Sequence, residues 1–196
     1  MVIAHVCNSG LYRPADDRET NEWRKELGKE RNQIDCEHGD SVIRDEGPFA
    51  CALGALRRGD FASAEAEFTS LLAEQHLARN DRLFLLNKRG VARIGLKRPE
   101  QARADFEAAL ELEPSFAPAI ANLGNLLLEE GDLDGAIAAY ERAIACDGDY
   151  AVAYLNLGVA YKRRGRVADG VRALRHAQRL EGRAIAAASW KRVRRR

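Results

Sequence analysis

The feature that most constrains this chain is a sequence that repeats itself every 34 residues. The tripeptide Asn-Leu-Gly at 122–124 returns at 156–158, and Gly131 and Ala143 return as Gly165 and Ala177. Self-similarity at a fixed period of this length indicates stacked supersecondary units that share a continuous core. The pattern divides the chain into four units, with a four-residue insertion between the first two. The units are 45–78, 83–116, 117–150 and 151–184.

Each unit is predicted to be two helices joined by a tight turn. In the third unit the apolar residues fall three and four apart, as they do on one face of a helix; they are Ile120, Leu123, Leu127, Leu133, Ala136, Ile137, Tyr140 and Ile144. Gly131 suits the left-handed conformation that ends a helix, and Asp132 suits the cap of the next one. Small residues predict close helix packing within a unit, with Gly90, Gly124 and Gly158 facing Ala102, Ala136 and Gly170.

The periodicity predicts ten helices and no strand. The expected ranges are 20–34, 48–58, 61–76, 81–95, 99–112, 117–130, 133–146, 151–164, 167–180 and 183–193. A hydrophobic content of 46% with 7% aromatic residues favours helices. No apolar run reaches the roughly 18 residues that cross a bilayer, and the first residues lack a basic leader, so we expect a cytoplasmic protein without a membrane span.

These residues and their spacing resemble the tetratricopeptide repeat, a 34-residue helix–turn–helix unit. The resemblance covers about 45–184 and departs from the family pattern at Arg89 and Arg93, which occupy places that are often apolar. It implies an all-α fold, a right-handed superhelical array of helix–turn–helix repeats. Residues 1–44 are then an N-terminal extension, partly helical or disordered, and 185–196 a C-terminal capping helix with a basic tail.

What the resemblance implies about function is recognition of another protein. The first helix of each pair lines a concave groove in this family, and the groove commonly holds an extended peptide or a helix of a partner. Matching positions place the groove here on Phe84, Asn87, Lys88, Val91, Asn122, Asn125, Leu128, Glu129, Asn156, Val159, Lys162 and Arg163. We therefore expect a non-enzymatic scaffold or adaptor.

Two asparagines of this set have two interpretations. Asn125 and Asn156 stand where family members hold a peptide backbone with paired amides, which donate and accept at once. Asparagine is also common at both places as repeat filler. The basic side chains with which some family members clamp a C-terminal carboxylate are absent: Ala121, Ala186 and Trp190 occupy their places. An adaptor for chaperone tails is therefore disfavoured.

Charge is divided unevenly along the chain. Residues 1–150 carry 18 Lys and Arg against 28 Asp and Glu, whereas residues 151–196 carry 13 against 2. Pairs of Asp134 or Glu141 with arginines of the fourth unit are expected to use part of this asymmetry. The cationic excess at 183–196 predicts an acidic partner segment, or weak head-to-tail self-association with the acidic face of another copy. A nucleic-acid partner at this end is the alternative, and a short basic end without a binding motif argues against it.

The remaining reactive side chains favour neither metal binding nor catalysis. His5, Cys7, Cys36 and His38 are four soft ligands, but one intervening residue in each pair is shorter than zinc sites use. Cys51 and Cys146 are interpreted as small core residues of a reducing compartment. No phosphate-binding loop, nucleophile elbow or zinc-protease motif is present. We expect no metal, no cofactor and no enzymatic activity.

Overall fold

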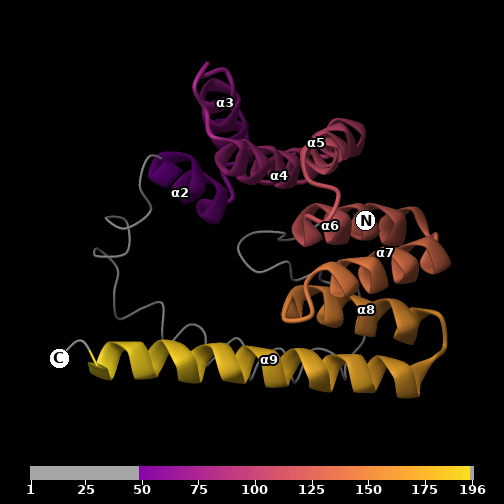
Figure 1. Cartoon of the computed structure of the whole chain (residues 1–196). Helices are drawn as coiled ribbons and strands as arrows, with labels where there is room; N and C mark the ends of the chain where they lie inside the picture. The colour runs from indigo at the N-terminus through magenta and orange to yellow at the C-terminus, as the bar shows by residue number, and fades with distance from the viewer. Residues whose placement is uncertain (1–48, 195–196) are drawn as a thin grey trace.

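The structure, a computed structural model, describes residues 49–194, with side chains up to residue 183. The described residues form helices and turns, without a strand. Two helices belong to each predicted unit and follow one another through the stack (Figure 1). They are α2 (Ala50–Arg58), α3 (Phe61–Leu72), α4 (Arg79–Gly95), α5 (Pro99–Leu112), α6 (Ala117–Glu130), α7 (Leu133–Cys146), α8 (Ala151–Arg163) and α9 (Val167–Arg194).

Helix boundaries agree with the sequence prediction in the middle of the chain and differ at its end. The predicted 99–112, 117–130 and 133–146 are the observed α5, α6 and α7. The predicted break between 180 and 183 is wrong, because α9 continues without interruption through 28 residues. Gly182 is the single helix-breaking residue there, and the alanine-rich sequence after it favours helix by more than one glycine costs, about 1 kcal/mol. The predicted helix 20–34 lies outside the described residues.

The turns within the units share one backbone conformation at the predicted period. Gly59, Gly131 and Gly165 have φ values of 78°, 87° and 83°. Lys97 takes the same place in the second unit with a φ of 60°, where a side chain is strained. Asp132 then caps α7, since its carboxylate accepts from Gly135 N at 2.9 Å. The turn chemistry that the sequence predicted is therefore confirmed in the third unit.

Close packing within a unit depends on glycine, whose nearest neighbour is a large side chain of the second helix. A Cβ on Gly90 would lie 2.4 Å from the ring of Phe106, and one on Gly124 would lie 2.8 Å from that of Tyr140. The atoms nearest to these two glycines are therefore mostly those of a ring on the second helix, and the predicted facing of Gly90 by Ala102 and of Gly124 by Ala136 stays a prediction. At Gly158 the prediction held in part, since both Leu174 and the carbonyl oxygen of Gly170 are close.

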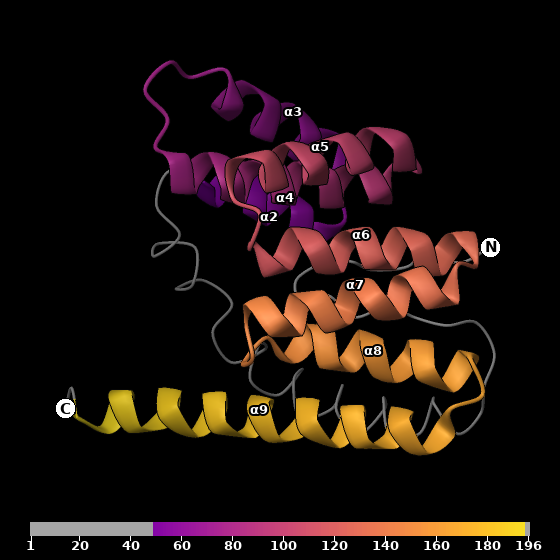
Figure 2. The ribbon, with the colours of Figure 1, turned by 45° about the vertical axis from the view of Figure 1, so that its right-hand side comes forward.

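The stack has an inner layer of first helices and two apolar cores. Helix α6 contacts both α4 and α8, which places the first helices of successive units side by side (Figure 2). One core lies mainly among α2 to α5, around Phe68, Leu85 and Phe106. The other lies among α6 to α9, around Ile120 and Tyr140. The inner layer crosses the junction between these cores.

The two described cysteines are not core residues. Both Cys51 and Cys146 are exposed. The buried side of α2 is formed by Ala52, Ala55 and Leu56, and Cys51 lies outside it. The prediction that these thiols fill the core was therefore wrong.

Candidate functional site

The twelve predicted groove residues all lie on the inner helices α4, α6 and α8. Five of them are buried, namely Asn87, Val91, Asn122, Leu128 and Asn156. Solvent reaches the other seven, which are Phe84, Lys88, Asn125, Glu129, Val159, Lys162 and Arg163. We call these twelve residues the inner face. A partner on it would contact the accessible seven, while the buried five support them.

Four asparagines of the inner face form one continuous hydrogen-bonded chain across three units. Asn156 Nδ2 donates to Asn125 Oδ1 at 2.8 Å, and Asn125 Nδ2 donates to Asn122 Oδ1 at 3.3 Å. Asn122 Nδ2 in turn donates to Asn87 Oδ1 at 2.8 Å. We call this row the asparagine chain. It joins α8 to α6 and α6 to α4, so holding the inner helices together is one role of these side chains.

The asparagine chain ends in an acceptor without a donor. Asn156 has none of its surface exposed, and its Oδ1 is the one buried side-chain polar atom without a hydrogen-bond partner in the described part of the chain. Leaving a buried acceptor unpaired costs about 1–3 kcal/mol. Native structures tolerate few such atoms, and a ligand donor is one explanation of them.

Tyr140 fixes the orientation of the central amide. Its hydroxyl donates to Asn125 Oδ1 at 2.7 Å, so this oxygen accepts two hydrogen bonds. Burial raises the pKa of Tyr140 above its ordinary value, which keeps the donating proton in place. Asn125 Nδ2 carries two hydrogens, and among the described residues Asn122 uses one of them.

Charge differs along the accessible part of the inner face. Glu129 is exposed, although nearby atoms remove part of the water around its carboxyl group and raise its pKa. Lys162 and Arg163 lie at the basic end of α8. At the other end Phe84 stacks on Phe49 with 5.9 Å between ring centroids, and Lys88 Nζ lies 5.3 Å from the Phe84 centroid. The face thus offers an aromatic end, a central amide and a cationic end.

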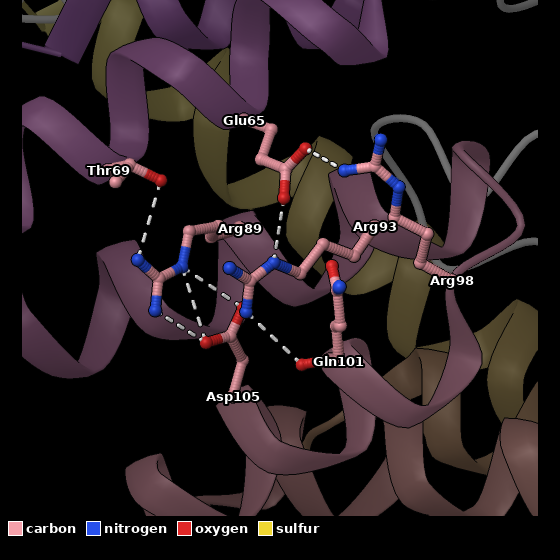
Figure 3. Close-up of polar contacts among 7 residues, drawn as sticks. All are labelled: Glu65, Thr69, Arg89, Arg93, Arg98, Gln101 and Asp105. Atoms are coloured by element: carbon pink, nitrogen blue, oxygen red, sulfur yellow. Dashed lines mark hydrogen bonds and ion pairs between the residues drawn. The ribbon is translucent and has the colours of Figure 1, made fainter.

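A second polar cluster joins the first two units, and sequence reasoning missed it (Figure 3). Asp105 is 3% exposed and accepts from Arg89 Nη2 at 2.7 Å. Arg93 Nη1 lies 2.8 Å from Asp105 Oδ2, and its Nε donates to Glu65 at 3.0 Å. The arginines are therefore the partners of an acid that replaces the alanine of later units. The joint occurrence of Asp105 at an alanine position and of two arginines at often apolar positions was the sequence signal for this cluster.

The acidic third unit and the basic fourth unit are partly paired, as predicted for Asp134. Its carboxylate accepts from Arg164 Nε at 2.8 Å and from Nη2 at 3.1 Å. Glu141 instead accepts from the Tyr161 hydroxyl at 2.6 Å. Hydrogen bonding to Glu141 raises the pKa of Tyr161, and hydrogen bonding to Asp134 raises that of Arg164.

The described residues hold no group of three or more histidine, cysteine or acidic side chains suited to a metal ion. His5, Cys7, Cys36 and His38 lie outside the described residues, so their prediction is not tested. None of the helices in the described part of the chain has the length and apolarity needed to span a bilayer.

Paired helices on a 34-residue period, with glycine against a large ring and an inner layer of first helices, define a tandem helix–turn–helix repeat protein. Within this architecture, residues 85–165 are tetratricopeptide repeats. Three profiles of the family match the chain, two described as tetratricopeptide repeat over 85–116 and 106–138 and one as TPR repeat over 124–165. The first predicted unit, 45–78, lies outside these matches.

Two solved structures have a similar fold, which is a tetratricopeptide-type α-solenoid. The crystal structure of MamA matches with a TM-score of 0.53 and 18% identity, over 90% of this chain and 99% of that one. The crystal structure of YrrB, described as a TPR protein with an unusual peptide-binding site, matches with a TM-score of 0.51 and 20% identity, over 89% of this chain and 86% of that one.

Proposed function

We propose that this protein is a non-enzymatic scaffold that binds an extended peptide or a helix of a partner along the inner face. Repeats of this family are interaction modules, which supports binding of another protein as the general function. The observation that carries the finer proposal is the asparagine chain, in which the half-buried Asn125 keeps one amide N–H without a partner among the described residues. YrrB is described as having a peptide-binding site, and at 20% identity its likeness supports the fold rather than the site.

Recognition would centre on Asn125. This side chain is half-buried, and its amide is held by Tyr140, Asn122 and Asn156 before any partner arrives. A pre-ordered amide loses little rotamer freedom on binding, so its free N–H can donate to a backbone carbonyl at a low entropic cost.

The ends of the inner face suggest the composition of the partner. Lys162 and Arg163 favour an acidic segment at the α8 end, and Phe84 favours an apolar or aromatic side chain at the α4 end. The absence of catalysis is part of this proposal, as is the cytoplasmic location expected from the sequence.

The test is capture of partners from native extract with the full chain and with Asn125→Ala. Loss of a captured protein is expected for Asn125→Ala, because the central donor is gone. Asn80→Ala, which removes an exposed asparagine near the start of α4, is the matched control and should retain the partner. Circular dichroism should show equal helix content in all three proteins. Retention of every captured protein by Asn125→Ala would overturn the proposal.

Salt dependence separates this function from nucleic-acid binding at the basic end. Phosphate contacts release counterions, so such binding weakens steeply between about 0.05 and 0.2 M salt. Packing of a peptide on the inner face is expected to weaken far less. A steep salt dependence, together with loss of binding after nuclease treatment, would favour the alternative.

A further inference from the structure

Two outer helices carry opposite charge at the same repeat positions. Arg175 and Arg179 are exposed on α9, one helical turn apart. Glu107 and Glu111 are exposed on α5 at the equivalent positions, two 34-residue periods earlier. Each pair is extended toward the N-terminus of its helix by one more exposed residue of the same charge, Arg172 on α9 and Glu100 on α5. We call these three arginines the basic row and the three glutamates the acidic row. The arginines are three and four residues apart and the glutamates seven and four, and both spacings return to one helix face.

Charges of the acidic row are not neutralised within the described part of the chain. No ion pair there involves Glu100, Glu107 or Glu111. In the basic row Arg172 pairs with Asp169, Arg179 Nη2 lies 3.1 Å from His176 Nδ1, and Arg175 has no ion pair with a described residue. Helices α6, α7 and α8 lie between α5 and α9 in both views, so the rows cannot meet within one molecule (Figures 1 and 2).

We propose that the basic row on α9 of one copy docks on the acidic row on α5 of a second copy. The spacing matches, because residues four apart on each helix are about 6 Å apart along its axis. A second copy is favoured over other acidic partners because this chain itself supplies complementary charges, with Glu107 and Glu111 at positions equivalent to Arg175 and Arg179. This surface is the outer one, so the contact leaves the inner face open and is separate from the proposed function.

The contact is weak and depends on salt. Exposed ion pairs contribute about 0–1 kcal/mol each, and the apolar side chains beside the basic row are few: Val167 and Val171 are the exposed large hydrophobic residues among those described. Screening over about 10 Å at 0.1 M salt, and about 3 Å at 1 M, therefore removes most of the attraction. The sequence predicts self-association of residues 183–196 with the acidic face of another copy, and that prediction stays untested because the side chains after residue 183 lie outside the described ones. The present proposal uses residues 172–179 and the second unit.

The experiment is sedimentation velocity of the full chain with two charge-reversed variants. One variant is Arg172→Glu, Arg175→Glu and Arg179→Glu, and the other is Glu100→Lys, Glu107→Lys and Glu111→Lys. All six side chains are surface groups, and circular dichroism should confirm folding. At about 0.05 M salt the natural chain should self-associate, and at about 0.5 M it should be monomeric. Each variant alone should be monomeric at both salt concentrations.

The decisive result comes from mixing the two variants. An equimolar mixture at low salt should restore association with equal amounts of the two variants, because the natural basic row of one docks on the natural acidic row of the other and the two reversed rows are complementary as well. Asn125→Ala should self-associate like the natural chain, which keeps this outcome separate from failure of the inner-face proposal. A monomeric natural chain at low salt, association that survives either reversal, or a mixture that stays monomeric would overturn the proposal. Binding of a single-stranded oligonucleotide by a monomeric natural chain would assign the basic row to nucleic acid instead.

Discussion

The Tyr140 hydroxyl donates a hydrogen bond of 2.7 Å to Asn125 Oδ1, and so a residue of the buried core orients the central amide of the inner face. Tyr140 belongs to α7 and has none of its surface exposed. Its ring packs against Gly124, on the helix that carries Asn125. The core of the third unit and the proposed binding surface are thus connected through one side chain.

Tyr140→Phe should weaken partner capture while leaving the fold intact. The substitution keeps the ring and removes the donor, so the free energy of unfolding should fall by about 0.5–1.5 kcal/mol. Urea denaturation measures the stability change, and capture from extract measures binding. Tyr154→Phe on α8, where the ring stacks on His176, is the matched control. Equal capture by Tyr140→Phe and the natural chain would show that Asn125 needs no orientation by Tyr140.

Asp105→Ala should be strongly destabilising. It leaves the guanidinium groups of Arg89 and Arg93 without their shared carboxylate in a site where their side chains are 17% and 18% exposed. Breaking a buried ion pair from one side costs about 3–5 kcal/mol. Urea denaturation should show this loss, whereas Glu67→Ala, an exposed acid on α3, should change stability by less than about 0.5 kcal/mol. Similar effects of the two substitutions would mean that the cluster adds nothing to the junction of the first two units.

Lys97→Gly should stabilise the chain. A non-glycine residue in the left-handed region destabilises the folded state by about 1–2 kcal/mol. Glycine removes this strain, but it also makes the unfolded chain more flexible, which lowers the free energy of unfolding by about 0.4–1 kcal/mol. A net gain between zero and about 1.6 kcal/mol should appear in urea denaturation. Gly131→Ala should lose stability for the same reason, since its φ is 87° and nothing lies near the added methyl group. Gly148→Ala, which also has open space and lacks a positive φ, should not lose stability.

Alkaline pH should destabilise the fold through Tyr150. Burial and the nearby Asp147 raise the pKa of Tyr150 to about 12, against about 10 in an unfolded chain. The folded state therefore favours the protonated phenol, and this contribution is full below pH about 10 and lost as the pH rises toward about 12. Tyrosinate absorbance should show a component near pH 12 that Tyr150→Phe removes. Superimposable titrations of the two proteins would contradict this assignment.

The fold was predictable from the sequence because the repeat makes each unit evidence for the others. The start of α5, the end of α6 and the start of α7 follow from Pro99, Gly131 and Asp132, which act locally as first helical residue, C-cap and N-cap. The fusion of α9 was missed because a glycine such as Gly182 stops a helix only when the following residues leave it, and that depends on what they pack against. Asp105 was missed because its burial requires two arginines from the preceding helix.

The inner face was predictable in location but not in internal contacts. The period placed Asn122, Asn125 and Asn156 on the inner helices by repeat position alone. Their hydrogen bonds to one another depend on the distance between neighbouring units, which a period does not contain. The phenol of Tyr140 was interpreted as core filler, and its hydrogen bond to Asn125 adds a polar role to that packing role.

The division of the apolar interior into two cores has a mechanical consequence. The second and third units meet at α6, whose Ala119 and Leu126 belong to the first core and whose Ile120 and Leu128 belong to the second. Leu110 packs against both cores, and the Asn122–Asn87 hydrogen bond and the Arg103–Glu130 ion pair add polar links at this junction. Twisting the array should concentrate strain at this junction, since each half is internally close-packed. A partner lying along α4, α6 and α8 would cross the junction and hold the two halves in a single relative orientation. Its binding would therefore restrict the motion of both halves of the array relative to each other.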